Sequence, residues 1–383
     1  MAASNGQTVV DRLQAAIHTI DGSEMAKTVC KASTHELGPP KLKHLQKLQQ
    51  LTREHNVNQP ELLNLIVLRT KEKSWIVVGK ALVTCHHLLV NGNERFLQSS
   101  ATRPSLFTLE MFTDATHYEM SNFIKLYANY LNKRATSYRT MACDFCKLKK
   151  GKDSLWNKME HEKLIKQVPV LQDLLNTLMK FNSTNPQFGN PVVNSAFQLL
   201  HRDLVRLYAT YNDAMIVVIS KFYDMKMSHC KIAFKIYKDF LDHLDQFKKF
   251  FELAERVGCI VDKGDVPDLS KAPRQLLAPF QEHVNNGVDS NQSTPAKTSG
   301  RGSNLASPVQ LSGNGPDLAN EALREEARAL EKFSRNKVSE ADDEEFGGEI
   351  GVKSEFEIEK ISFEEIDFKE VCVFADFARN SGF

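Results

Sequence analysis

Lysine and histidine residues gather where the helical pattern near the start of the chain is interrupted. The stretch 27–44 reads KTVCKASTHELGPPKLKH. Its basic or protonatable side chains, called the basic cluster below, are Lys27, Lys31, His35, Lys41, Lys43 and His44. One helix is expected to end near Ser33, and Pro40 is expected to be the first residue of the next helix. Cations at a helix start oppose its dipole, whereas an anion is favoured there, and phosphate fits such a place best.

Apolar residues recur at helical spacing just before this cluster. The apolar positions within 8–20 are Val9, Val10, Leu13, Ala16, Ile17 and Ile20. Such a helix either docks on a protein core or folds on a bilayer and inserts its apolar face. Because the segment adjoins the lysines, we expect residues 1–21 to form a membrane-inserting helix. The inserted side chains would be Val9, Val10, Leu13, Ile17 and Ile20.

Charge is divided between two parts of the 383-residue chain. Residues 317–383 hold 9 basic and 19 acidic side chains, a net charge of −10, while the preceding 316 residues hold 40 and 29, a net of +11. A basic body indicates an anionic partner, either a membrane or a nucleic acid. No RRM, KH, zinc-finger or helix-turn-helix pattern is present, and a compact cluster suits one phosphorylated head group better than an extended backbone. We therefore expect no nucleic-acid partner, with RNA binding as a lesser alternative.

Few residues are arranged for catalysis or metal binding. Cys143 and Cys146 form a single C-x-x-C pair without a second pair or a nearby zinc-spaced histidine, and His86-His87 lies in an apolar run typical of packing. The chain also lacks P-loop, G-x-S-x-G and H-E-x-x-H motifs. We expect no catalytic residues, no metal and no cofactor. The seven irregularly spaced cysteines favour a reducing, cytosolic setting, and the short apolar runs favour peripheral membrane contact.

Helical spacing continues through most of the body. Patterned segments cover about 42–51, 62–68, 75–88, 119–137, 155–181, 190–222, 227–255 and 269–285. Strand patterns are scarce and no fixed repeat period is found, so we expect an all-α body at 22–285 arranged as a helical superhelix or solenoid. A flexible polar linker is expected at 286–316. The acidic tail, 317–383, is expected to be mostly disordered with one short helix.

Several motifs together resemble the ANTH-domain family of CALM-like clathrin-assembly adaptors. Lys31 is followed after nine residues by Lys41-Leu42-Lys43-His44, which matches the family's inositol-lipid signature K-x9-K-x-[KR]-[HY]. Further matches are HHLLVNGNERF at 86–96, YLNKRATSYR at 130–139, FYDMK at 222–226 and GDVPDLSKAP at 264–273. The likeness covers about residues 8–285.

The resemblance implies a right-handed α-helical superhelix that binds phosphatidylinositol 4,5-bisphosphate at the cytosolic face of the plasma membrane, with a cytosolic pool. It also implies work in clathrin-coated pits and vesicles, with clathrin heavy chain and the plasma-membrane clathrin adaptor complex as partners. Vesicle SNAREs of the synaptobrevin type would lie in a groove of the late helices that includes Ile219 and Leu244. The alternative is a soluble helical scaffold that binds peptides without lipid dependence.

Two departures from the family pattern affect these expectations. Leu42 stands where relatives often have the middle of three lysines, and losing that cation could weaken attraction to an anionic surface by up to ~1 kcal/mol. Leu42 would then either touch lipid or pack inward. The tail has no Asn-Pro-Phe or Asp-Pro-Phe motif, so clathrin binding rests on the family resemblance more than on residues of this chain.

Overall fold

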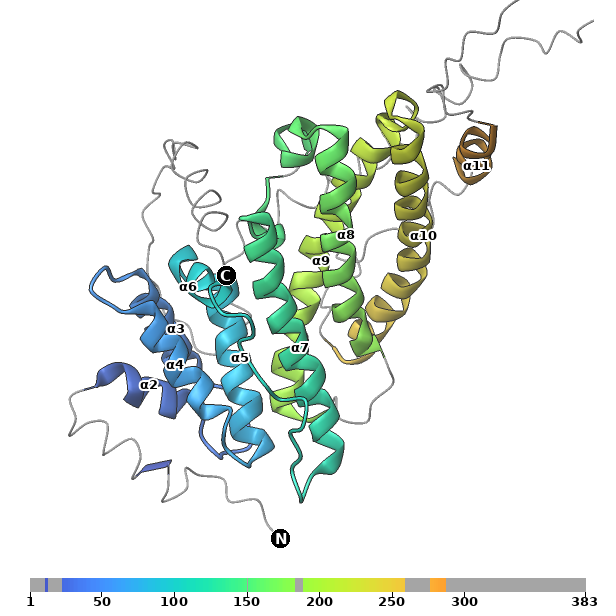
Figure 1. Cartoon of the computed structure of the whole chain (residues 1–383). Coiled ribbons are helices and arrows are strands. Elements are labelled where there is room, and N and C mark those ends of the chain that lie inside the picture. Colours follow the sequence, from blue (N-terminus) through green and yellow to red (C-terminus); the bar gives the residue numbers. More distant parts are fainter. Residues whose placement is uncertain (1–10, 13–22, 150, 183–188, 259–275, 287–383) are drawn as a thin grey trace, which may run out of the picture.

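The protein is described by a computed structural model covering residues 11–12, 23–149, 151–182, 189–258 and 276–286 (Figure 1). Its α-helices are α2 (Glu24–Ala32), α3 (Leu42–Arg53), α4 (Gln59–Arg69), α5 (Trp75–Asn91), α6 (Glu94–Ala101), α7 (Tyr118–Met141), α8 (His161–Met179), α9 (Pro191–Ser220), α10 (Met227–Arg256) and α11 (Leu277–Asn286). Short 3₁₀ turns are η1 (Phe145–Lys147), η2 (Gly151–Asp153), η3 (Leu155–Lys158), η4 (Lys180–Asn182) and η6 (Phe222–Asp224). No strand occurs in these residues, which confirms the predicted all-α fold.

The helices follow one another across the molecule in chain order. Figure 1 shows α2 to α6 at one end, α7 in the middle, and the long helices α8, α9 and α10 towards the other end, with α11 outside α10. Helices close in sequence pack together, as α2 does with α3, α7 with α8, and α10 with α11. A single apolar core runs from Val29 in α2 to Phe280 in α11. The basic cluster therefore lies at the end of the molecule opposite α11.

Local chemistry explains where the first two helices end and begin. The Ser23 hydroxyl accepts the Ala26 N–H at 3.2 Å and so caps the start of α2. At the other end the Ser33 hydroxyl donates to the Val29 carbonyl at 2.8 Å. Pro40 was predicted to be the first residue of α3, and this was wrong, because Lys41 is still extended and its carbonyl accepts the first helical N–H, from His44 at 2.9 Å.

Other boundaries differ from the sequence prediction in two places. The single helix predicted for 155–181 is divided into η3 and α8, because Met159 and Glu160 have extended backbone between them. The helix α6 had no predicted counterpart, although Asn93 caps it by accepting the Arg95 N–H at 3.0 Å. The predicted membrane-inserting helix, apart from residues 11–12, and the linker and acidic tail beyond 286 lie outside the described residues.

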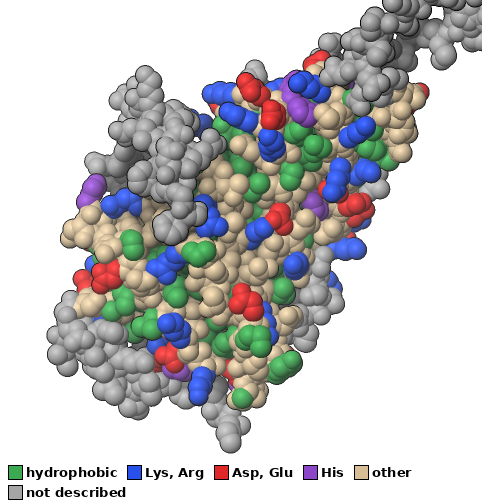
Figure 2. All heavy atoms as spheres, viewed as in Figure 1, with side chains coloured by type: hydrophobic (Ala, Val, Ile, Leu, Met, Phe, Trp, Pro, Cys, Tyr) green, Lys and Arg blue, Asp and Glu red, His purple; other side chains and the backbone are tan. Residues whose placement is uncertain are grey.

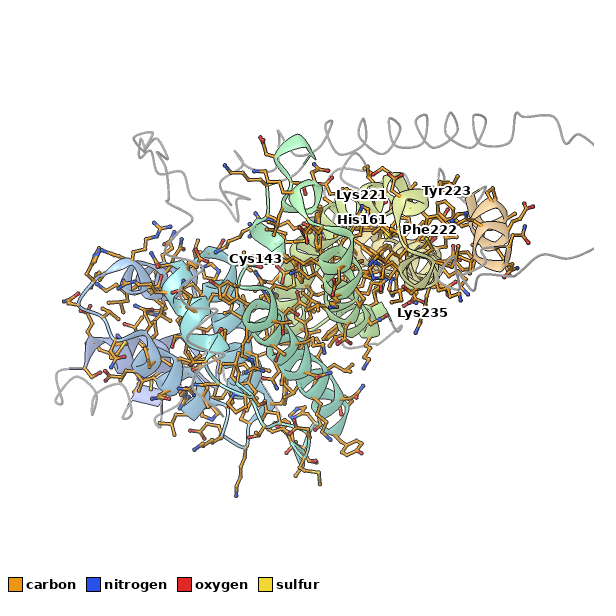
Figure 3. All side chains as sticks on the ribbon, turned by 45° about the horizontal axis from the view of Figure 1, so that its top comes forward. Cys143, His161, Lys221, Phe222, Tyr223 and Lys235 are labelled. Carbon is orange, nitrogen blue, oxygen red and sulfur yellow. The ribbon has the colours of Figure 1, made fainter. Side chains whose placement is uncertain are left out.

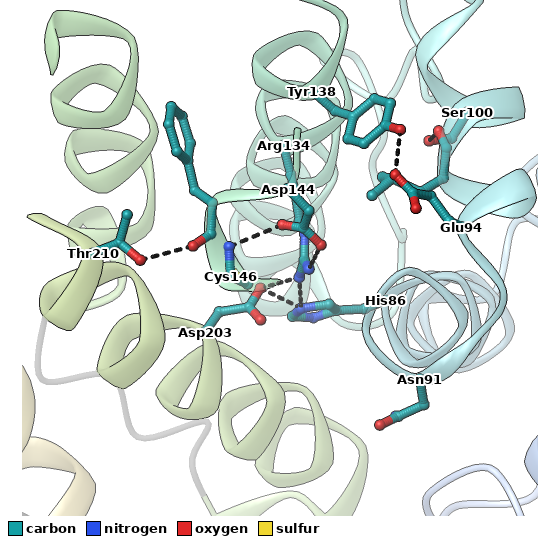
Figure 4. Close-up of polar contacts among 12 residues, drawn as sticks. His86, Asn91, Glu94, Ser100, Arg134, Tyr138, Asp144, Cys146, Asp203 and Thr210 are labelled. Atoms are coloured by element: carbon teal, nitrogen blue, oxygen red, sulfur yellow. Dashed lines mark hydrogen bonds and ion pairs between the residues drawn. The ribbon is translucent and has the colours of Figure 1, made fainter. Parts of the chain in front are cut away.

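A buried polar network joins α5, α7 and α9 in the interior (Figure 4). The Asp203 carboxylate accepts from Tyr130 at 2.5 Å, contacts His86 Nε2 at 2.8 Å and is paired with Arg134. Arg134 also pairs with Asp144 at 3.0 Å. Burial alone would raise the pKa of Asp203, but the charges of Arg134 and His86 outweigh it and hold that pKa well below its usual range. His86 is thus a hydrogen-bonded member of this network rather than a simple packing residue.

Candidate anion-binding site

The basic cluster is assembled from the end of α2, the following loop and the start of α3. Lys27 and Lys31 lie one turn apart on α2, and Lys43 and His44 lie in the first turn of α3. Burial lowers the pKa of His44, and the charges of Lys43, Lys31 and Lys41 lower it further. The packing of α2 against α3 places Lys31 at the side of the α3 start, where Lys41, Lys43 and His44 lie. Lys41 and Lys43 are exposed, whereas Lys27, Lys31 and His44 are half-buried.

The start of α3 has no acidic compensation of its own. Its N-cap, Lys41, makes no capping hydrogen bond with its side chain, and its first turn contains no Asp or Glu. In the described part of the chain, Lys27, Lys31 and Lys43 form no ion pair. Partial positive charge from the helix end therefore adds to the lysine charges. An anion placed here would relieve their mutual repulsion and would raise the pKa of His44 again.

Buried cations from two other helices hold the connecting loop 33–41 in place. Arg69 of α4 donates to the Ser33 hydroxyl at 2.9 Å and to its carbonyl at 2.8 Å. Lys80 of α5 donates to the Thr34 hydroxyl at 3.0 Å and to the Glu36 carbonyl at 3.1 Å. Sequence reasoning missed both anchors. A lysine inside the apolar run of α5 was the one signal that could have pointed to Lys80.

Lys80 has an unusual electrostatic position beneath this loop. Burial lowers its pKa to about 8, although the charges of Glu36 and Asp11 oppose that effect. Lys80 therefore keeps its proton at neutral pH and adds a positive charge below the exposed lysines. Its role is to position the loop, because both of its hydrogen bonds are made to loop atoms.

His35 and Lys41 already have acidic partners. His35 Nδ1 lies 2.9 Å from Asp11 Oδ1, and the His35 backbone N–H donates to Asp11 Oδ2 at 3.0 Å. Asp11 is buried. Lys41 Nζ lies 3.0 Å from Glu36 Oε2. An incoming anion would therefore compete with Asp11 for His35. It would also replace Glu36 as the partner of Lys41.

The remaining predicted positions have different outcomes. Leu42 is 50% exposed, so it does not pack inward. Ile219 and Leu244, predicted for a SNARE groove, are both buried and line no open surface in the described residues. Phe222, three positions after Ile219, is labelled in Figure 3. Phe280 of α11 stacks on it, with 3.9 Å between the two ring centroids. The positions predicted to insert into a membrane lie outside the described residues.

No metal-binding group competes with the basic cluster in the described residues. No group of three or more His, Cys, Asp or Glu side chains is placed to hold a metal ion there. Burial raises the pKa of Cys143 to about 12, and Cys146 is buried as a free thiol. On the face of the molecule that Figure 2 draws, Lys and Arg side chains are scattered, with acidic side chains among them. Among the helices of the described ranges, none combines the length and the apolarity needed to span a bilayer.

Comparisons with known proteins give matches over most of the described helices. A model described as "ANTH domain" matches residues 24–286. The chain is 46% identical over 283 residues to the phosphatidylinositol-binding clathrin assembly protein of Rattus norvegicus, covering 73% of this chain and 44% of the relative. It is 47% identical over 284 residues to a clathrin coat assembly protein of Homo sapiens, covering 73% and 31%. The chain thus aligns with less than half the length of these relatives. The protein belongs to the ANTH domain family.

Proposed function

We propose that this protein is a non-enzymatic, peripheral membrane adaptor that binds phosphatidylinositol 4,5-bisphosphate through its basic cluster. The observation that carries the proposal is the packing of α2 against α3, which sets Lys31 beside Lys41, Lys43 and His44 at a helix start whose first turn has no acidic residue. A phosphorylated inositol ring carries several anionic oxygens within a small volume. Charge-assisted hydrogen bonds from lysines and free N–H groups suit that distribution better than one carboxylate would.

Rigid support makes the cluster suitable for binding a head group. The loop between α2 and α3 is held by Arg69 and Lys80 from beneath, so little ordering is needed when a ligand arrives. Lys27 and Lys31 extend the cationic surface along α2. His35 joins them if the phosphate competes with Asp11. The same arrangement would also bind a soluble inositol phosphate. A vesicle assay distinguishes binding of the membrane lipid from binding of the soluble compound.

The wider role that we propose is coupling of membrane and cargo to clathrin coat assembly. It is supported by the family match and by relatives whose names describe clathrin assembly, including one from Drosophila melanogaster that is 45% identical over 294 residues. Partners would be clathrin heavy chain, the plasma-membrane adaptor complex and synaptobrevin-type SNAREs. The site of action would be the cytosolic face of the plasma membrane, in coated pits and vesicles, with a cytosolic pool.

Flotation with vesicles that contain the bisphosphorylated lipid tests the lipid-binding part of the proposal. The double variant Lys31→Glu with Lys41→Glu should bind at least about tenfold more weakly, because each lysine near an anionic surface is worth about 1 kcal/mol. Lys231→Glu with Lys235→Glu, on an exposed face of α10, gives a control with the same change in net charge. Unchanged flotation of the Lys31→Glu with Lys41→Glu variant would contradict the assigned site. Equal losses of binding in this variant and in the control would show that the attraction to the membrane is non-specific.

A further inference from the structure

Two exposed leucines stand beside the basic cluster. Leu37 is 47% exposed and Leu42 is 50% exposed, although most large apolar side chains of the described residues lie in the core. Leu37 belongs to the loop between α2 and α3, and Leu42 is the first residue of α3, between Lys41 and Lys43. Isolated exposed leucines are ordinary on a protein surface. Two of them within six residues, one before a cationic helix start and one at it, form an amphipathic edge.

The loop presents these side chains from a fixed base. Ser33, Thr34 and Glu36 are hydrogen-bonded to Arg69 and Lys80, as described above, and Pro40 at the end of the loop is buried. At Gly38, between the two leucines, a side chain would meet no atom within 4 Å. The middle of the loop therefore stands clear of the protein body while both ends are held. Exposure of Leu37 and Leu42 is a consequence of this supported geometry.

We infer that Leu37 and Leu42 enter the boundary between head groups and acyl chains when the basic cluster holds an inositol lipid. A bilayer surface offers anionic groups and hydrocarbon within a few ångströms of each other, which matches lysines interleaved with leucines. A peptide partner would need an acidic and an apolar face in the same spacing. Membrane contact requires only that the lipid stay in its bilayer. This inference rests on the proposed function and assigns the leucines a separate, apolar part of the interaction.

Separate measurements on a soluble head group and on vesicles test the inference. The double variant Leu37→Ser with Leu42→Ser should bind vesicles containing the bisphosphorylated lipid about tenfold more weakly, because apolar area is no longer buried. Its affinity for soluble inositol 1,4,5-trisphosphate, measured by calorimetry, should stay within about twofold of the wild-type value, since the cations are unchanged. Ile232→Ser is a matched control, because Ile232 is 44% exposed on α10, at the other end of the molecule.

A second variant separates apolar contact from charge at the same position. Leu42→Lys supplies the third lysine of the family pattern, so it should bind the soluble head group more tightly by up to about fivefold. On vesicles its gain should be smaller, because the inserted leucine is lost.

The outcomes bear on different claims. Vesicle binding by the double serine variant that equals the wild type would overturn the leucine contact, and a protein partner for these leucines would then be the better explanation. Equal losses on vesicles and on soluble head group would also overturn it, because the leucines would then shape the cation site. A wild-type protein that ignores the inositol lipid in both assays would overturn the proposed function itself.

Discussion

The basic cluster and the Asp203 network use similar side chains for opposite purposes. Both contain cations and histidine, and in both a carboxylate contacts one of these side chains. In the interior, two carboxylates, Asp203 and Asp144, pair with one buried arginine, and Tyr130 donates a hydrogen bond to Asp203. At the start of α3, several cations gather, and two carboxylates, Asp11 and Glu36, contact only His35 and Lys41 among them. Each charged group of the interior network has a partner of opposite sign, whereas the surface group has an excess of positive charge.

That difference teaches where charge serves stability and where it serves binding. A buried charge without a partner is costly, so the interior permits only groups whose partners come from the same fold. At the surface, water screens repulsion and allows an excess of one sign to persist until an anion arrives. Lys80 and Arg69 belong to both situations, because they are buried like the network yet they support the surface cluster. Variants can therefore test whether each residue serves mainly the stability of the fold or the binding of an anion.

The largest effect is expected from Asp203→Ala. The variant leaves Arg134, His86 and Tyr130 without their shared acceptor in the interior, which should lower the free energy of unfolding by about 3–5 kcal/mol. Urea unfolding followed by circular dichroism measures it. Asp173→Ala is the control, because Asp173 forms an exposed ion pair with Lys133 and should cost less than about 1 kcal/mol. Similar losses in both variants would remove the contrast between interior and surface pairs.

Much of the fold could be predicted from sequence, because helical periodicity and capping are local. The apolar spacing at 42–51 predicted the helix α3, and the spacing of Lys31 and Lys41 predicted the basic cluster. The anchors could not be found in this way, because they join distant residues: Arg69 lies 36 positions from Ser33, and Lys80 lies 46 from Thr34. The start of α3 was misplaced for a related reason. The conformation of Lys41 depends on the anchored loop before it, which no local rule describes.

Lys80→Met should reduce both stability and lipid binding, because it joins the two regions. The Thr34 hydroxyl and the Glu36 carbonyl lose their donor, at a cost of about 1–3 kcal/mol in the free energy of unfolding. Loosening of the loop should then weaken binding to inositol-lipid vesicles by several-fold. A loss of stability with unchanged vesicle binding would show that the anchor does not shape the basic cluster.

The same variant has a predicted pH signature. Lys80 has a pKa of about 8 in the folded protein and an ordinary value of 10.5, so between these values the unfolded chain binds more protons. Stability contributed by this group must therefore rise with pH from about 8 to 10.5. Other groups also titrate in this window, so the quantity to measure is the difference between wild type and Lys80→Met in urea unfolding. That difference should grow as pH rises, and a flat difference would contradict the burial of a charged Lys80.

The smallest effect is expected from Asp11→Asn, which acts on the edge of the surface cluster. The amide keeps the shape of the carboxylate but removes the negative charge 2.9 Å from His35 Nδ1. Stability should fall by about 1 kcal/mol, because a charge-assisted contact becomes a neutral one. Affinity for inositol-lipid vesicles should rise by about twofold to fivefold, since a competing anion has been removed from beside the cluster. Weaker binding would show that Asp11 holds His35 in the geometry that a phosphate needs. Asp11 would then assist phosphate binding instead of competing with the phosphate.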